Sequence, residues 1–136
     1  MADFNTSGIN EQLLGLMGLV NNLGRITGKM IRAARDELID AWKDGIQKNG
    51  FIDTGAMYSS VGGEIYNLGG EGRCTDVYPQ GVDGKGVRNA EKAFILHYGK
   101  PSMPASYFLD KVEKVGEEKA NEVAQAILDE ELAKLG

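Results

Sequence analysis

The stretch RITGKMIRAARDELIDAWKDGIQKN, from Arg25 to Asn49, decides the fold because it carries the strongest helical pattern in the chain. Charged side chains occupy one side of the predicted helix, and Asn49-Gly50 supplies a left-handed stop. The other side is an apolar stripe at helical spacing: Ile26, Met30, Ile31, Ala34, Leu38, Ala41, Trp42 and Ile46. We therefore predict a long amphipathic helix that buries this stripe.

A second long helix is predicted at the C-terminal end. Pro101 and Pro104 bracket a turn, and the helix is expected to begin within a residue or two of Pro104 and to run to Leu135. Gly116 is expected to bend or interrupt it. Its apolar stripe is Phe108, Val112, Val115, Ala120, Val123 or Ala124, Ile127, Leu128, Leu132 and Leu135. A weaker helix is predicted from Ile9 to Asn22.

The middle of the chain changes character, since eight of the nineteen glycines lie between Gly62 and Gly86. Short apolar alternations at 64–68 (EIYNL) and 74–79 (CTDVYP) flank the turn signal LGGEGR and predict a β-hairpin. A flexible loop is predicted over PQGVDGKGVRN, residues 79–89. Residues 90–98 fit a short helix or a buried strand equally well, and Gly99 ends this element.

Together these elements predict one α+β domain spanning residues 1–136. A small antiparallel β-sheet packs against long amphipathic helices, in the order helix, helix, strand, strand, helix or strand, helix.

Composition narrows the possible functions. The net charge of −5 and the pI of about 4.9 offer no concentrated positive face for reading nucleic acid. The single cysteine, Cys74, can form neither an internal disulfide nor a cysteine-based zinc site. The N-terminus resembles no secretory signal, and no apolar run reaches the roughly 20 residues of a membrane-spanning helix. We expect a soluble protein that is made inside the cell, without membrane contact.

The tripeptide Asp53-Thr54-Gly55 is similar to the active-site loop of retroviral aspartic proteases, which act as homodimers. Those enzymes are almost entirely β and place the loop after a buried strand, whereas Asp53 here follows a predicted helix. A motif counts only in its structural context. The favoured interpretation is that Gly55 permits close backbone approach and that Asp53 or Thr54 caps a short helix in TGAMYSSV, residues 54–61. A homodimeric aspartic protease is the alternative.

Other candidate chemistry is sparse. His97 is the only histidine, and no serine or cysteine partner is marked, so a packing or interface role is favoured. The glycine-rich GGEGR and DGKG complete neither a P-loop nor an EF-hand. We therefore predict no catalytic residue, no cofactor and no metal site.

Charge is distributed unequally between the two long helices. From Pro104 onward there are eight acids against four bases, whereas residues 25–49 carry six bases against four acids. One interpretation is that each charged face is simply solvated. The other is that the acidic helix of one copy meets the basic helix of another copy in an assembly.

The order of three segments resembles the head–tail joining, or tail-completion, proteins of long-tailed bacteriophages. DTGAMYSSV follows the helical N-terminal half, a glycine-rich β region comes next, and AFILHYGKPSMPASYFLDKV leads into the closing helix. His97, Lys100 and Tyr107 depart from the residues usual in that family. The residues that carry the resemblance, and hence the candidate interface, are Asp53, Thr54, Gly55, Ser59, His97, Tyr98, Gly99, Pro104, Phe108 and Leu109.

The resemblance implies a structural virion protein without catalysis, made in the host bacterial cytoplasm and located where the tail meets the neck. Subunits would form a homo-oligomeric ring, commonly a hexamer, and can be monomers in isolation. Their neighbours would be tail-tube, tail-terminator or neck proteins. DNA would pass through the ring without sequence-specific binding, and an acidic helix facing the channel would repel its phosphates. A small bacterial binding protein of the same architecture is a further alternative.

Overall fold

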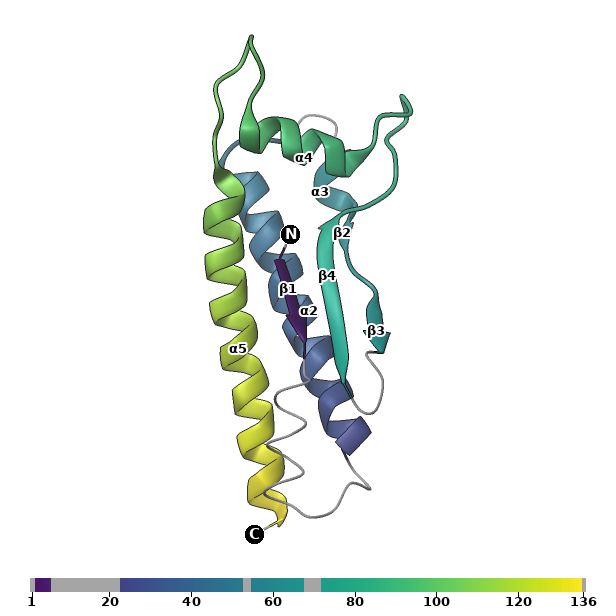
Figure 1. The fold of residues 1–136 in the computed structure, drawn as a ribbon, viewed down its shortest axis with the longest axis vertical. Helices are drawn as coiled ribbons and strands as arrows, with labels where there is room; N and C mark the ends of the chain where they lie inside the picture. The colour runs from purple at the N-terminus through teal and green to yellow at the C-terminus, as the bar shows by residue number, and fades with distance from the viewer. Residues whose placement is uncertain (1, 6–22, 53–54, 68–71, 136) are drawn as a thin grey trace.

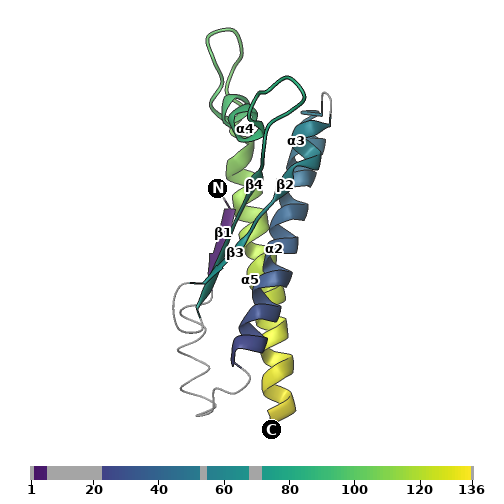
Figure 2. The same cartoon turned by 90° about the vertical axis from the view of Figure 1, so that its right-hand side faces the viewer.

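The computed structural model describes residues 2–5, 23–52, 55–67 and 72–135 (Figure 1). The predicted helix from Ile9 to Asn22 lies outside the described residues, as do Asp53, Thr54 and the tip of the predicted hairpin. The described part is α+β, as predicted from the sequence: a helix pair carries a small antiparallel sheet on one side, and a short helix lies across one end (Figures 1 and 2).

Two long helices, α2 (Leu23–Lys48) and α5 (Phe108–Leu135), lie side by side and form the body. Every residue of the apolar stripe predicted in α2 is buried, and Trp42 is completely so. The helix ends where the sequence indicates, because Gly50 adopts a left-handed φ of 70° and its N–H donates to the Gln47 carbonyl.

Two glycines allow the helices to approach closely. A Cβ at Gly45 would overlap Cγ2 of Val112, and a Cβ at Gly116 would lie 3.0 Å from Cδ2 of Leu38. The expectation that Gly116 bends or interrupts the last helix is wrong, since α5 runs unbroken through this buried residue. The missing side chain serves contact between helices and not flexibility.

The sheet is built around β4 (Arg73–Pro79). On one edge β4 pairs antiparallel with β1 (Ala2–Asn5), so that Phe4 lies opposite Thr75. On the other edge it pairs with β2 (Val61–Gly62) and β3 (Ile65–Asn67). The pairing of β3 with β4 confirms the predicted hairpin, whereas β1 was not predicted.

Residues of β4 alternate between the two faces of the sheet. Thr75, Val77 and Pro79 are buried toward the helices, and the residues between them are half-buried on the outer face. Gly63 separates β2 from β3, and a Cβ there would come within 2.6 Å of the Asp76 carbonyl oxygen. The edge strand therefore follows β4 closely because this position is glycine.

Two short helices complete the fold. Residues 56–59 form α3 (Ala56–Ser59), and residues 89–98 form α4 (Asn89–Tyr98), which settles the helix-or-strand ambiguity in favour of a helix. Helix α4 ends at Gly99, as predicted. The turn that follows is closed by two backbone hydrogen bonds between Lys100 and Met103.

Helix α5 begins at Phe108, four residues later than Pro104, so the predicted start is wrong. The N–H groups of Ser106 and Tyr107 donate to the carbonyls of Leu96 and His97, at 3.2 and 3.0 Å. This segment thereby satisfies the last carbonyls of α4, which would otherwise lack partners. Residues up to Tyr107, which has a φ of 54°, are therefore held out of the helix.

Candidate functional site

The described residues of the sequence motif gather at one end of the molecule. We call this region the α4 end; it comprises α3, α4 and the loops 50–52, 80–88 and 99–107. Helix α3 packs against α4, and α4 against the start of α5 (Figure 1). The motif residues therefore lie in the α4 end or at the adjoining start of α5, although they come from segments far apart in sequence. They are Gly55, Ser59, His97, Tyr98, Gly99, Pro104, Phe108 and Leu109.

His97 joins α4 to α5. Its side chain is 7% exposed, and its Nδ1 accepts a hydrogen bond of 3.2 Å from the backbone N–H of Leu109. Because Nδ1 accepts, the proton of the neutral imidazole lies on Nε2. The ring packs edge-on against Tyr107 and Phe108, with centroids 5.5 and 6.4 Å away. His97 is therefore a packing residue, as predicted, and it also caps the first turn of α5.

Gly99 is required, for two reasons, at the corner where the chain turns from α4 to α5. Its φ of 79° disfavours any side chain, and a Cβ would lie 2.6 Å from the Ala105 nitrogen and 2.8 Å from the Met103 carbonyl oxygen. The close backbone approach lets the chain turn back over α4. Ser106 completes the corner, since its hydroxyl donates to the Leu96 carbonyl and accepts from the N–H of Phe108.

Gly55 has a different role from the one predicted. It was expected to permit close backbone approach, but a Cβ at this position would meet nothing within 4 Å. Glycine suits the position because φ is 85°. Gly55 itself is the N-cap of α3 and contributes no side chain. The predicted cap from Asp53 or Thr54 involves residues outside the described ranges.

The loop from Gln80 to Arg88 is organised by Asp83. Its Oδ1 accepts the N–H groups of Lys85 and Val87 at 2.8 and 2.9 Å, and its Oδ2 pairs with the Lys92 ammonium at 2.5 Å. The hydrogen bond and charge of Lys92, with the backbone donors, hold the pKa of Asp83 down at about 2. The segment is a loop, as predicted, and these contacts give it a hydrogen-bonded arrangement.

Asn89 fixes the same loop from its other side. Its side-chain amide donates to the Gln80 carbonyl at 2.9 Å, and its backbone N–H donates to the Gly81 carbonyl at 3.0 Å. Both ends of the loop are thus tied to the start of α4.

A groove of about 790 Å³ opens at the α4 end, between α3 and α4. Apolar side chains and three lysines line it, together with Asp83 and several glycines. Its apolar surface includes Phe51, Ile52, Met57, Ile95, Leu96 and Met103, and its cations are Lys85, Lys92 and Lys100.

Exposed apolar side chains concentrate on the same end. Among the described residues, seven of the eight large apolar side chains that are exposed lie here, and Tyr66 on β3 is the eighth. Phe94 and Tyr98 on α4 stack with centroids 6.2 Å apart and planes 10° apart. The seven are Ile52, Val82, Val87, Phe94, Ile95, Tyr98 and Tyr107.

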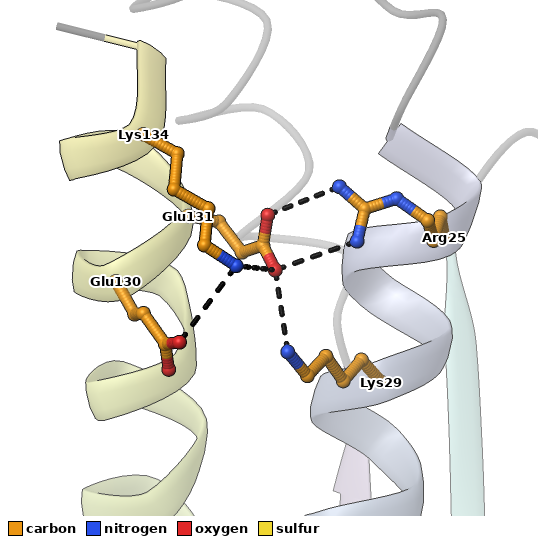
Figure 3. Close-up of polar contacts among 5 residues, drawn as sticks. All are labelled: Arg25, Lys29, Glu130, Glu131 and Lys134. Atoms are coloured by element: carbon orange, nitrogen blue, oxygen red, sulfur yellow. Dashed lines mark hydrogen bonds and ion pairs between the residues drawn. The ribbon is translucent and has the colours of Figure 1, made fainter.

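At the opposite end of the helix pair, Glu131 links α5 to α2 (Figure 3). The side chain is 3% exposed, and its oxygens lie 3.0 Å from an Arg25 nitrogen, 3.3 Å from Lys29 and 3.5 Å from Lys134. The hydrogen bond from Arg25 is the main cause that lowers the pKa of Glu131 to about 2. Opposite charges of the two helices thus meet within one chain at this point.

Sequence reasoning missed the groove and most of the exposed apolar surface. Of the seven exposed side chains, only Tyr98 was a candidate. Asp83 could have been recognised as a loop organiser, because an aspartate followed by Gly84 and Gly86 is a turn signal. The groove has no such signal, since five separate segments contribute its lining.

The described ranges hold neither a metal-binding cluster nor a membrane-spanning helix. Within them, no three His, Cys, Asp or Glu side chains gather as they would around a metal ion. None of the described helices is long and apolar enough to cross a membrane.

Comparison with known proteins gives no relative: no family model, no curated protein and no solved structure matches this chain.

Proposed function

We propose that this chain is a structural subunit of a bacteriophage tail-completion, or head–tail joining, ring, and that the α4 end contacts its neighbours. The proposal rests on the resemblance in sequence order described above. The observation that carries it is the concentration of exposed apolar side chains on a single end of the molecule. Large apolar patches on a folded surface commonly mark protein interfaces.

The motif residues support a structural role in this proposal. The His97 ring is buried and its Nδ1 is engaged by Leu109. Gly99 shapes a corner, and Phe108 and Leu109 are buried at the start of α5. These residues set the position of α4, so that Phe94, Ile95 and Tyr98 project from a fixed platform.

The charge of α5 fits the proposed passage of DNA. Most of its acids are exposed, whereas Glu131 is buried and paired with cations from both helices. A channel wall formed by the exposed acids would repel phosphate groups and limit adhesion of DNA without reading its sequence. In this proposal the subunit joins tail-tube, tail-terminator or neck proteins in the virion.

The aspartic protease remains the alternative function for Asp53-Thr54-Gly55. A helical body with a small sheet differs from the almost entirely β architecture of retroviral proteases. In addition, Gly55 leads directly into helix α3. Both features favour the structural role for this motif over peptide hydrolysis.

Deleting the gene in its parent phage tests the proposal. We expect electron micrographs of the lysate to show filled heads and separate tails, and infectious particles to return when the wild-type chain is supplied in trans. Joined, infectious particles without the chain would contradict the proposal.

Supplying Asp53→Asn in the same assay separates the two functions. The structural role predicts joined particles at the wild-type level, because an amide preserves the shape of the side chain. A protease would lose its activity with this change, so a return to unjoined particles would favour the alternative.

A further inference from the structure

The groove at the α4 end combines an apolar interior with a cationic rim. Met57 is buried, Leu96 is partly buried, and Ile52 and Ile95 remain 47% and 40% exposed. Lys85 and Lys100 are exposed, Lys92 is half-buried, and all three belong to the lining. With Asp83 as the acid in the lining, three cations against one anion leave a local charge of +2.

This local charge is opposite in sign to that of the whole chain, which is −5. Asp83 is already neutralised by Lys92 and by backbone donors. No ion pair is found for Lys85 or Lys100 within the described ranges. Their ammonium groups are thus available to an anionic partner.

The groove is held open by the structure of its walls. The loop that carries Lys85 is fixed by the hydrogen bonds of Asp83 and Asn89, and the segment that carries Lys100 is fixed by the turn to Met103. A Cβ at Gly50, Gly55 or Gly84 would meet no atom within 4 Å. Glycine at these lining positions leaves space at the mouth of the groove.

Two classes of occupant can be compared on chemistry. The exposed face of α5 in a second copy is acidic, but its exposed positions carry charged and polar side chains or alanine. It would satisfy the lysines and leave the apolar interior unfilled. A segment that carries large apolar side chains next to carboxylates satisfies both.

We propose that this groove binds a short acidic segment of another protein, with one or two large apolar side chains in the interior and carboxylates at Lys85 and Lys100. The inference rests on the proposed function in one respect, since it names the chemistry by which the α4 end joins a neighbour. Charge complementarity of this kind sets specificity and speeds encounter.

Selection from a random decapeptide display library on the immobilised full chain tests the inference. We expect enrichment of sequences that combine Asp or Glu with Leu, Ile, Phe or Trp. The selected peptides are then synthesised and titrated by fluorescence anisotropy and by amide chemical shifts. Shifts should cluster on residues 50–52, 55–58 and 83–103.

The double variant Lys85→Glu/Lys100→Glu should weaken binding of the selected peptides at least tenfold. Lys111→Glu/Lys119→Glu on exposed positions of α5 changes the net charge equally and should leave binding unchanged. Binding should also weaken as salt rises from 50 to 500 mM.

Each other outcome overturns the inference. Enrichment of basic or purely apolar peptides, equal loss in both double variants, or shifts confined to the face of α5 would exclude an acidic partner in the groove. Concentration-dependent self-association that displaces the peptide and persists in Lys85→Glu/Lys100→Glu would assign the groove to a second copy. Particle joining that fails on gene deletion while no acidic peptide binds would reject this inference alone and leave the proposed function standing.

Discussion

His97 shows how one side chain can set the geometry of a surface that it does not reach. Its Nδ1 satisfies the buried N–H of Leu109, and its ring packs between Tyr107 and Phe108 at the start of α5. An unsatisfied buried donor costs about 1–3 kcal/mol. The only histidine of the chain therefore contributes to the angle between α4 and α5.

His97→Gln should lower the free energy of unfolding by about 1–3 kcal/mol, since the amide oxygen of glutamine lies too far out to replace Nδ1. His97→Asn places an acceptor near the Nδ1 position and should recover part of this loss. Urea denaturation measures both variants. Equal stability of the Gln and Asn variants would contradict a capping role for Nδ1.

Glu131 gives a pH-dependent contribution to stability. Its pKa in the folded chain is about 2, against an ordinary value of 4.5. The stabilisation is therefore complete above pH 4.5 and is lost as pH falls through 4.5 toward 2. Asp83 acts in the same direction, because its pKa falls from 3.8 to about 2.

Replacing Glu131 by Gln should lower Tm at pH 7, and the difference from wild type should shrink between pH 4.5 and 2. Thermal unfolding followed by circular dichroism across this range measures the effect. Glu122→Gln on the exposed face of α5 is the matched control and should change Tm little. A Glu131→Gln difference that stays constant down to pH 2 would exclude ionic stabilisation.

At the scale of the element, contact between α2 and α5 depends on small residues. Gly45 faces Val112, and Gly116 faces Leu38 and Ala41. Protein interiors are close-packed, so an added methyl group at such a position forces the helices apart. A helical period identifies the stripe of each helix but gives no indication of how closely the stripes meet.

Gly45→Ala should destabilise the chain by about 1–3 kcal/mol, although alanine favours the helix by about 1 kcal/mol. Gly28→Ala in the same helix is the control, because its Cβ meets only the flexible side-chain ends of Arg32 and Arg73, and it should be neutral or stabilising. The double variant Gly45→Ala/Val112→Ala should recover part of the loss by removing the overlap. Denaturant unfolding measures the free energy of unfolding of each variant. A Gly45→Ala variant more stable than wild type would contradict the close approach of α2 and α5.

The helices α2 and α5 and the β3–β4 hairpin were predictable because their patterns are local. Strand β1 was not, since its four residues find their partners in β4 between 69 and 75 positions away. The sequence could not show whether α4 is a helix or a strand, because the element has only ten residues and its polarity does not follow its burial. Phe94, Ile95 and Tyr98 are apolar but exposed, whereas His97 is polar but buried. The start of α5 was predicted wrongly because the backbone N–H groups of residues 106 and 107 donate to the last carbonyls of α4, which keeps these residues out of the helix.

At the scale of the whole molecule, the two ends have different characters. One end of the helix pair is closed by ion pairs around Glu131, and the other presents apolar side chains and a lysine-bordered groove. The sequence motif could indicate the α4–α5 corner, because its residues are contiguous in two segments. It could not indicate the groove or the patch, which arise only when distant loops meet.

The double variant Phe94→Glu/Tyr98→Glu should fold normally and fail to enter particles. Both side chains are exposed, so we expect Tm to change by only a few degrees. Supplying the variant in trans to the gene deletion measures the yield of joined particles, which we expect to fall at least tenfold. Gln125→Glu/Ala126→Glu on the exposed face of α5 is the matched control. A normal yield of joined particles with Phe94→Glu/Tyr98→Glu would contradict a role for the α4 end in assembly.

The most direct measurement of the central claim is site-specific photocrosslinking inside purified particles. A photoreactive phenylalanine replaces Tyr98 at the α4 end or Gln125 on α5, and mass spectrometry identifies what each attaches to. We predict that position 98 crosslinks to copies of this chain or to tail and neck proteins, at much higher yield than position 125. Absence of the chain from particles, or crosslinks at position 125 alone, would contradict the claim that the α4 end joins this subunit to its neighbours.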